Sequence, residues 1–212
     1  MKARHLLSVG MLICVASTAS AAVTVTSYTM QNGETGSFVY QDTTYLPCVA
    51  GECTTSLANL TGGTGSLTDG VVPPNSWNAS GSTQVWVGWT SIRPSIDFNF
   101  SGSPIISKVN LDLDNTPGTG DVRLPISVDI GSFNYLVAPD ASFGPRWVSF
   151  DIPDNSYSSL NIWLNADGAG RWVMLGEVSF DEAQGAVPEP GTVGIVGGGL
   201  LALTARRLRR RS

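Results

Sequence analysis

Apolar and polar residues alternate with a period of two over most of the chain between residues 23 and 180. Successive side chains of a β-strand point to opposite faces, so this pattern predicts half-buried strands. The clearest example is residues 95–100 (Ser-Ile-Asp-Phe-Asn-Phe). We expect about ten strands, at residues 23–30, 38–41, 85–89, 95–100, 108–113, 122–130, 133–137, 148–152, 160–164 and 172–180.

Turn-forming residues separate these runs, and no segment of useful length outside the two ends of the chain has a helical period. Many short strands divided by turns predict an all-β fold, an antiparallel jelly-roll β-sandwich. Pro125 interrupts the strand pattern at 122–130, which indicates an edge or a bulge there. The glycine-rich run 61–66 is expected to be a flexible loop, because it does not join a strand to a helix as a phosphate-binding loop does.

The N-terminus has the three parts of a secretory signal. Lys2 and Arg4 give a charged start, residues 6–15 are apolar, and residues 19–21 (Ala-Ser-Ala) are small. The sequence therefore predicts a signal peptide at 1–21 and export of the rest of the chain. An uncleaved N-terminal anchor is the alternative.

The C-terminal end combines a proline-bounded motif, a short apolar segment and a basic cluster. The motif lies at 187–190 (Val-Pro-Glu-Pro) after a linker at 182–186, and the uncharged segment 191–205 follows it. Proline fixes φ and lacks an N–H, so the motif is expected to stay extended and accessible. The segment is predicted to span a membrane, although about 20 apolar residues are usual for a bilayer. The basic end 206–212 is expected to remain cytoplasmic as the membrane stop, through Arg206, Arg207, Arg209, Arg210 and Arg211.

This tail resembles the PEP-CTERM sorting signal of exported bacterial proteins, with Pro188, Glu189 and Pro190 as the motif. The resemblance implies an exosortase as partner and a transient intermediate anchored in the inner membrane. Transfer to the cell surface or the extracellular (biofilm) matrix of a Gram-negative bacterium would follow. An ordinary membrane anchor is the alternative.

Removal of both ends leaves residues 22–186, which comprise one β-sandwich domain at 22–181, long enough for a substantial core, and the linker 182–186. The chain has 12 basic and 17 acidic residues; seven basic residues and one acidic residue lie in the ends, which leaves five against 16 and a net charge near −11. Such a domain repels phosphates, so we expect no nucleic-acid partner. The single histidine, His5, lies in the signal peptide, which excludes Ser-His-Asp and Cys-His catalysis in the domain.

The domain contains two cysteines, Cys48 and Cys53. In an exported protein the default for such a close pair is a local disulfide. A metal site is a poor alternative, because two thiolates need further ligands and the domain has no histidine.

A second, larger resemblance extends over about residues 60–180. Residues 67–70 (Leu-Thr-Asp-Gly), 85–89 (Val-Trp-Val-Gly-Trp) and 177–180 (Glu-Val-Ser-Phe) follow the order of the discoidin, or galactose-binding-like, β-sandwich. The resemblance implies a structural calcium shared by Asp69 and Glu177. The chain lacks the terminal cysteine pair of the better-known members, so their ligands do not carry over.

Each of these acidic residues also has a simpler interpretation. Asp69 fits a turn residue that bonds its own backbone before a glycine, and Glu177 fits an exposed strand carboxylate. Residues 112–115 (Asp-Leu-Asp-Asn), with Asp121, form another acidic cluster, which we expect to be a solvated turn because it lacks EF-hand spacing.

All six tryptophans lie in the domain. Carbohydrate-binding proteins stack sugar rings on exposed aromatic side chains, with polar groups nearby. Trp77, flanked by polar residues, and Trp86 are the predicted carbohydrate-binding residues. Trp86 and Trp163 are out of phase with the apolar faces of their strands, whereas Trp89 and Trp172 fit a core; core packing remains the alternative for each.

These features predict an exported surface or matrix protein with a non-enzymatic module that binds glycan or serves a structural role in exopolysaccharide. A carbohydrate-active hydrolase is the alternative, with Asp97 and Asp129, or Asp151 and Glu177, as the carboxylate pair. Glycosidases need such carboxyl groups about 5–10 Å apart.

Overall fold

The computed structural model describes residues 23–48, 51–79, 85–166, 168 and 170–183. The predicted signal peptide 1–21 and sorting tail 187–212 lie outside the described residues. No helix among the described residues is long and apolar enough to span a membrane.

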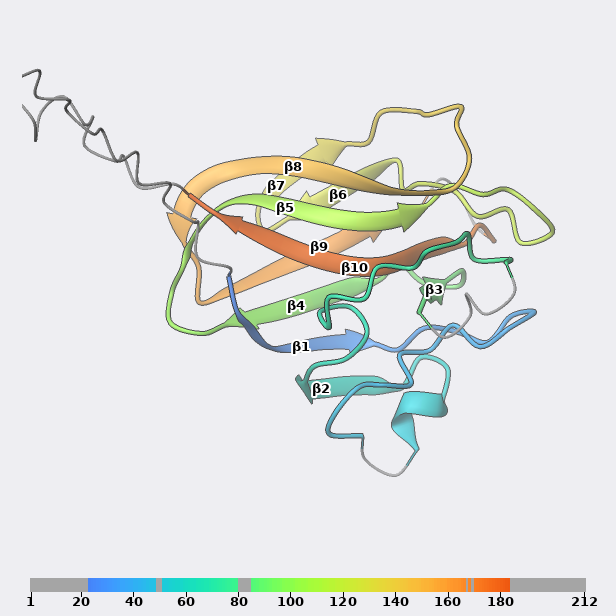
Figure 1. Cartoon of the computed structure of the whole chain (residues 1–212), viewed down its shortest axis with the longest axis horizontal. Helices are drawn as coiled ribbons and strands as arrows, with labels where there is room; N and C mark the ends of the chain where they lie inside the picture. The colour runs from blue at the N-terminus through green and yellow to red at the C-terminus, as the bar shows by residue number, and fades with distance from the viewer. Residues whose placement is uncertain (1–22, 49–50, 80–84, 167, 169, 184–212) are drawn as a thin grey trace, which may run out of the picture.

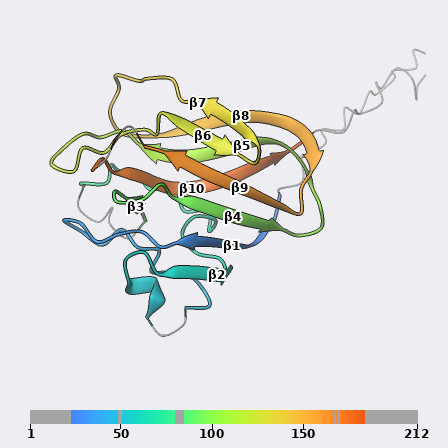
Figure 2. The same cartoon turned by 180° about the vertical axis from the view of Figure 1, so that it is seen from behind.

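The described residues form two antiparallel sheets that face each other, which confirms the predicted all-β sandwich (Figure 1). The four-stranded sheet, in front in Figure 1, and the six-stranded sheet, in front in Figure 2, each join strands far apart in sequence. A single 3-10 turn, η1 (Glu52–Thr54), is the only helical element among the described residues. The six-stranded sheet has the order β2 (Asn59–Gly63), β1 (Val25–Gln31), β4 (Ser95–Phe100), β9 (Ser159–Asn165), β6 (Ser127–Ile130), β7 (Phe133–Leu136), and the four-stranded sheet has the order β3 (Val87–Trp89), β10 (Val173–Glu182), β5 (Ile105–Asp114), β8 (Pro145–Ser156).

The main core lies between the sheets and consists of the apolar half of each alternating strand. Phe180 of β10 packs edge-on against Phe98 and Phe100 of β4, with ring centroids 5.2 and 4.9 Å apart. Full burial of such a side chain is worth about 1.5–3 kcal/mol. Period-two alternation in the sequence therefore places the core correctly.

Strand β6 differs from the prediction at its start. The pattern at 122–130 continues through Pro125, but the strand begins at Ser127. Proline cannot donate to a ladder, so pairing starts only after it. Pro125 does not mark an edge, because β6 lies between β9 and β7.

The glycine-rich run 61–66 is not simply a flexible loop. Its first residues belong to β2, and Thr64 exchanges two backbone hydrogen bonds with Leu46, at 2.8 and 3.1 Å. A Cβ on Gly63 would collide with the carbonyl oxygen of Leu46. The glycine therefore permits a close approach of two backbones. The predicted strand at 38–41 is also wrong, since its only β contact within the described residues is an isolated bridge from Thr35 to Val39.

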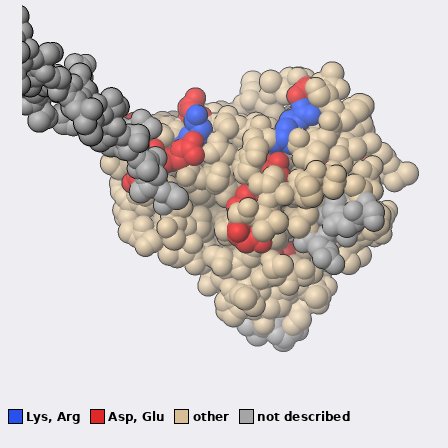
Figure 3. Space-filling view, viewed as in Figure 1, with Lys and Arg blue, Asp and Glu red and all other residues tan. Residues whose placement is uncertain are grey.

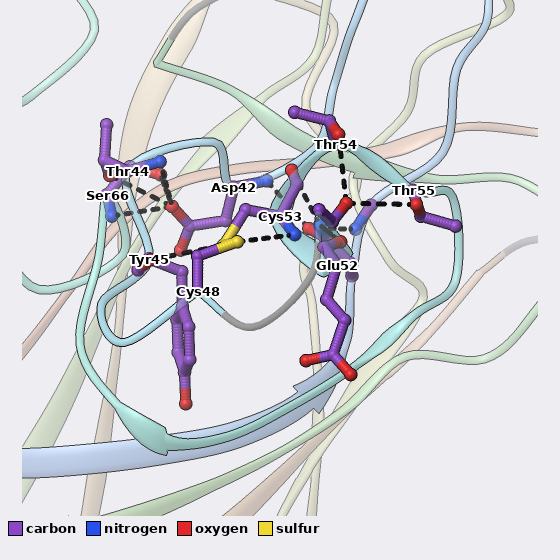
Figure 4. The surroundings of a disulfide bond; sticks show 12 residues. Asp42, Thr44, Tyr45, Cys48, Glu52, Cys53, Thr54, Thr55 and Ser66 are labelled. Atoms are coloured by element: carbon purple, nitrogen blue, oxygen red, sulfur yellow. Dashed lines mark hydrogen bonds between the residues drawn. A yellow bond between two sulfur atoms is a disulfide. The ribbon is translucent and has the colours of Figure 1, made fainter.

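The predicted disulfide is present between Cys48 and Cys53, whose Cα atoms are 5.8 Å apart (Figure 4). The Cys53 carbonyl accepts a hydrogen bond from the Asn32 side chain at 3.1 Å, which ties this loop to the residue after β1. The disulfide thus closes a small loop at the β2 edge of the six-stranded sheet.

A fully buried carboxylate, Asp42, organises the same region. Its Oδ1 accepts hydrogen bonds from the backbone N–H and hydroxyl of Ser66, at 3.1 and 2.8 Å, and from the hydroxyl of Thr44 at 3.0 Å (Figure 4). Its Oδ2 accepts one from the Tyr28 hydroxyl of β1. Buried charges require such partners. Asp42 therefore links the loop that contains Thr44 and the loop that contains Ser66 to β1.

Candidate functional site

An acidic centre lies on the outer face of the four-stranded sheet, under the turn at 67–70. The Leu67 carbonyl accepts a hydrogen bond from the Val178 N–H at 2.8 Å, which fixes the turn on β10. The Gly70 N–H donates to Glu177 Oε2 at 3.2 Å. Figure 3 shows a group of acidic side chains near the middle of this face. The turn thus brings Asp69 close enough to Glu177 for its charge to raise the pKa of Glu177.

Asp69 also acts as the turn residue of its simpler interpretation. Its Oδ1 accepts a hydrogen bond from the Val71 N–H at 2.8 Å, the bond of an Asx turn. Glu177, by contrast, is not an exposed strand carboxylate, because only 5% of it is accessible. The two roles of Asp69 are compatible, since one carboxylate oxygen is left for another partner.

A β-bulge adds a third carboxylate to this centre. The register of β10 against β5 shifts between Leu175 and Val178, so Gly176 and Glu177 both lie opposite Asp112. A Cβ on Gly176 would lie 2.5 Å from Asp112 Oδ2, which explains the glycine at this position. Asp112 is 1% exposed, and its Oδ2 has no hydrogen-bond partner in the described part of the chain.

The cluster at 112–115 is therefore not the solvated turn that we expected. Asp112 and Asp114 belong to β5 and are buried beneath the loop that precedes β3. Asp114 accepts hydrogen bonds from the Trp77 N–H and, at 2.6 Å, from the Thr116 hydroxyl. The sequence pattern could not reveal this burial, because an outward strand position is normally solvated unless a distant loop covers it.

Burial raises the pKa values of two carboxyls in this centre. Desolvation is the main cause for Glu177, whose pKa rises to about 8; Asp69 and Asp112 add to the rise and the Gly70 N–H opposes it. Desolvation, followed by the charge of Asp114, raises the pKa of Asp112 to about 7. Both groups therefore hold protons near neutral pH that a bound cation would displace.

The donor set suits calcium only in part. The described residues contain no group of three or more histidine, cysteine or acidic side chains arranged around a common metal position. Asp69 and Glu177 would thus need backbone carbonyls or hydroxyls to complete the 6–8 oxygens of a calcium site. The buried Thr68 hydroxyl, which has no hydrogen-bond partner among the described residues, is an oxygen of this kind.

The structure corrects the prediction that Trp77 and Trp86 bind carbohydrate. Trp77 is 4% exposed and donates its Nε1–H to the Thr116 carbonyl at 2.6 Å, while Trp86 is fully buried and donates to the Asn75 carbonyl at 3.0 Å. Both pack in a second core cluster with Tyr40. The loop that contains Trp77 folds back over the sheet, so neither ring offers a face to a sugar.

The tryptophan that does reach the surface of the six-stranded sheet is Trp163. It lies on β9 directly opposite Ser95 of β4 and Asp129 of β6, on the side facing away from the core. The Arg93 guanidinium lies over its ring, 4.6 Å from the centroid, and forms an ion pair with Asp129. Its phase in the strand pattern was the sequence signal for this position.

Neither carboxylate pair of the hydrolase alternative occupies directly paired positions on neighbouring strands. Asp97 and Asp129 lie on the same face, but β9 separates them and their pairing positions differ by two residues. With strands ~4.8 Å apart and ~3.4 Å per residue, the two positions are roughly 12 Å apart. Asp151 of β8 pairs with Lys108 of β5, and Lys108 pairs in turn with Asp181 of β10, four residues from Glu177. The positions of Asp151 and Glu177 are therefore two strands and about four residues apart, which is farther still. These positions do not support the hydrolase alternative.

Residues 186–211 match the PEP-CTERM protein-sorting motif. The match includes Pro188, Glu189 and Pro190, as predicted, and lies outside the described residues. Among curated proteins, none matches the chain.

Solved structures with similar backbones include carbohydrate-binding modules. The GH31 CBM32-2 module bound to GalNAc has 10% identity and a TM-score of 0.40, and covers 77% of this chain and 100% of its own. The family 32 module of C. perfringens NanJ in complex with galactose has 16% identity and a TM-score of 0.35 (55% and 82% coverage). A Streptococcus pneumoniae fucose-binding module, SpX-3, has 16% identity and a TM-score of 0.34 (47% and 73%). At these values the likeness assigns no ligand to this chain.

Proposed function

We propose that this chain is an exported cell-surface or extracellular-matrix protein, sorted by an exosortase, whose β-sandwich binds glycan without catalysis. The observation that carries the proposal is the PEP-CTERM motif at 186–211, directly after a folded sandwich domain. Such a motif implies export, exosortase processing and a membrane-anchored intermediate. The domain is then the part that acts outside the cell, in contact with exopolysaccharide.

The chemistry of the domain supports binding rather than turnover. The domain has no histidine, and the backbone positions of the carboxylate pairs considered above lie roughly 12 Å or more apart, which does not favour glycoside hydrolysis. The outer face of the six-stranded sheet carries serine, asparagine and aspartate side chains around one accessible tryptophan, Trp163. Sugars are bound by such combinations of hydrogen-bonding groups and an aromatic ring.

The direct test is a glycan array probed with the full-length chain in detergent. We expect saturable binding to a subset of polysaccharides and no release of reducing ends during prolonged incubation. Hydrolysis products that disappear in a single carboxylate-to-amide variant would establish an enzyme instead. An array without any bound glycan would leave a purely structural role in the matrix.

We also propose that Asp69 and Glu177 hold a structural calcium, with Asp112 beside them. The support is a pair of adjacent carboxylates, one of them buried, and a neighbouring carboxylate oxygen that lacks a hydrogen-bond partner among the residues that the structure describes. When bound, calcium would neutralise these charges and fix the turn at 67–70 on β10.

This proposal predicts a pH dependence of stability. Without calcium, the raised pKa values of Glu177 (about 8) and Asp112 (about 7) mean that the folded state binds protons more tightly than the unfolded state. Their contribution to stability is therefore complete below the unfolded pKa values of about 4 and is lost as the pH rises through 7 and 8. Calcium should raise the melting temperature by several degrees at pH 8 and by much less at pH 5.

The Glu177→Gln variant separates the two effects. It should melt higher than the wild type in chelator at pH 8, because a buried charge is gone, and it should no longer respond to calcium. Asp97→Asn, on the other sheet, is the matched control and should keep the wild-type response. Equal melting temperatures in calcium and chelator at pH 8 would remove the calcium site.

A further inference from the structure

The outer face of the six-stranded sheet presents alternate residues of β9 in ordered rows with its neighbours. Ser95, Trp163 and Asp129 form one row across β4, β9 and β6, and Asn134 of β7 continues it. Asn165 and Ser127 form the next row. The intervening residues of β9 are in the core, so the residues in these rows point to the outer side of the sheet, which is in front in Figure 2.

Hydrogen bonds hold these polar side chains in place. The Asn165 amide donates to the Ser127 hydroxyl at 2.9 Å, and the Asn134 amide donates to both Ser127, at 3.2 Å, and Asp129. Among the described residues, neither amide oxygen accepts a hydrogen bond. Because an asparagine can donate two and accept two hydrogen bonds, each amide keeps spare capacity in a fixed orientation, at little further entropic cost.

Arg93 and Trp163 add a planar donor and an aromatic ring to the same rows. The guanidinium lies over the indole and is held at its other end by Asp129, with 46% of the Arg93 side chain and 27% of the Asp129 side chain accessible. Hydrogen bonds from Asn134, then from Asn165 and Arg93, hold the pKa of Asp129 below its usual value. Donors and an ionised acceptor thus lie side by side, as adjacent sugar hydroxyls require.

A hollow of about 230 Å³ adjoins this face at the end of β9. Arg93 and Asn165 belong to both the hollow and the rows, and Thr90 and Ser91 contribute further polar groups to its lining. Its volume is below the ~300–1,000 Å³ of sites for drug-sized ligands. The hollow therefore suits one ring of a chain that continues across the sheet.

The charge of the face selects the class of ligand. Arg93 is balanced by Asp129, and the nearby Asp97 leaves the face slightly negative, in a domain with a net charge near −11. Anionic sugars such as uronates would be repelled, whereas uncharged hydroxyl-rich sugars would not. Complementarity thus favours neutral sugar units.

We infer that Trp163, Arg93, Asp129 and Asn165 form the glycan-binding surface of this protein and that it recognises neutral sugar units of a polysaccharide. This inference rests on the proposed glycan-binding function and deepens it by naming the face and the ligand class. The surface lies on the six-stranded sheet, on the opposite side of the sandwich from the acidic centre of the four-stranded sheet.

The test compares two tryptophans on opposite sheets. The full-length chain in detergent is titrated with neutral and uronate polysaccharides chosen from an array, as wild type and as Trp163→Ala, Asn165→Ala and Trp147→Ala variants. Trp147, on β8, is 44% exposed and serves as the matched control. We expect Trp163→Ala and Asn165→Ala to weaken binding of a neutral glycan about tenfold or more, and Trp147→Ala to change it less than about twofold.

The melting temperature of each variant distinguishes lost contacts from lost folding, and Asn165→Ala, the smaller change, keeps the test valid if Trp163→Ala unfolds. Neutral-glycan binding that survives both changes would refute this surface and leave the proposed function standing. Binding of uronates alone would refute the ligand class. A wild-type chain that binds no glycan at all would overturn both the inference and the proposed function.

Discussion

Replacing Asp42 with alanine is expected to lower the free energy of unfolding by about 3 kcal/mol or more, because a buried acceptor with several donors is lost. The N–H and hydroxyl of the buried Ser66 would lose their acceptor, whereas those of the exposed Thr44 would turn to water. The Tyr28 hydroxyl, which also donates a hydrogen bond to Asp42, would be buried without this acceptor. The expected result is a large decrease in the urea concentration at the midpoint of unfolding, which is measured by tryptophan fluorescence.

Two further variants check the reasoning. Asp42→Asn keeps one carbonyl oxygen for Ser66 and Thr44, so it should cost less than alanine. Asp97→Ala removes an exposed carboxylate of β4 and should stay within about 0.5 kcal/mol of the wild type. If Asp42→Ala costs no more than Asp97→Ala, the network does not organise this region.

Replacement of Pro188, Glu189 and Pro190 by alanines is expected to hold nearly all of the protein in the membrane fraction. Alanine favours helix whereas proline enforces an extended backbone, so the change should remove both the recognised residues and their accessible conformation. The measurement is immunoblotting of membrane, cell-surface and medium fractions of cells that carry the exosortase.

A control just upstream tests whether the motif itself matters. Alanine at Glu182 and Gln184 alters the same region but leaves the motif intact, so sorting should continue. Normal release of the triple-alanine variant would contradict the assignment of the motif as the processing site. An otherwise identical strain without exosortase should reproduce the retention seen with the variant.

Most of the sheet structure could be predicted, because period-two alternation is a local property. Nine of the ten strands in the described part of the chain fall within or overlap the predicted runs, and β2 is the exception. Residues 59–63 (Asn-Leu-Thr-Gly-Gly) offer no alternation, and the strand forms by pairing with β1, while Gly63 lets the Leu46 backbone approach closely on its other side. Such a close approach is a tertiary effect that a local pattern does not contain.

The sites were less predictable than the sheets. The approach of Asp69 to Glu177 followed from a motif resemblance, whereas the burial of Asp112 depends on a loop more than thirty residues earlier in the chain. The polar neighbours of Trp77 indicate an exposed loop residue, yet the loop folds onto the sheet, where the Ser76 hydroxyl accepts a hydrogen bond from the Thr116 hydroxyl at 2.8 Å. The outward position of Trp163, in contrast, could be predicted from its phase in a regular strand.

The position of β10 has a mechanical consequence. The chain leaves the domain at the end of this strand, which pairs with β5 through Glu182 and with β3 at its other end. Hydrogen bonds of an antiparallel ladder run perpendicular to the strands, so tension along β10 loads them together in shear instead of opening them one by one. A domain tethered through its C-terminal side would thus resist drag from a moving polymer far better than one held by an edge strand.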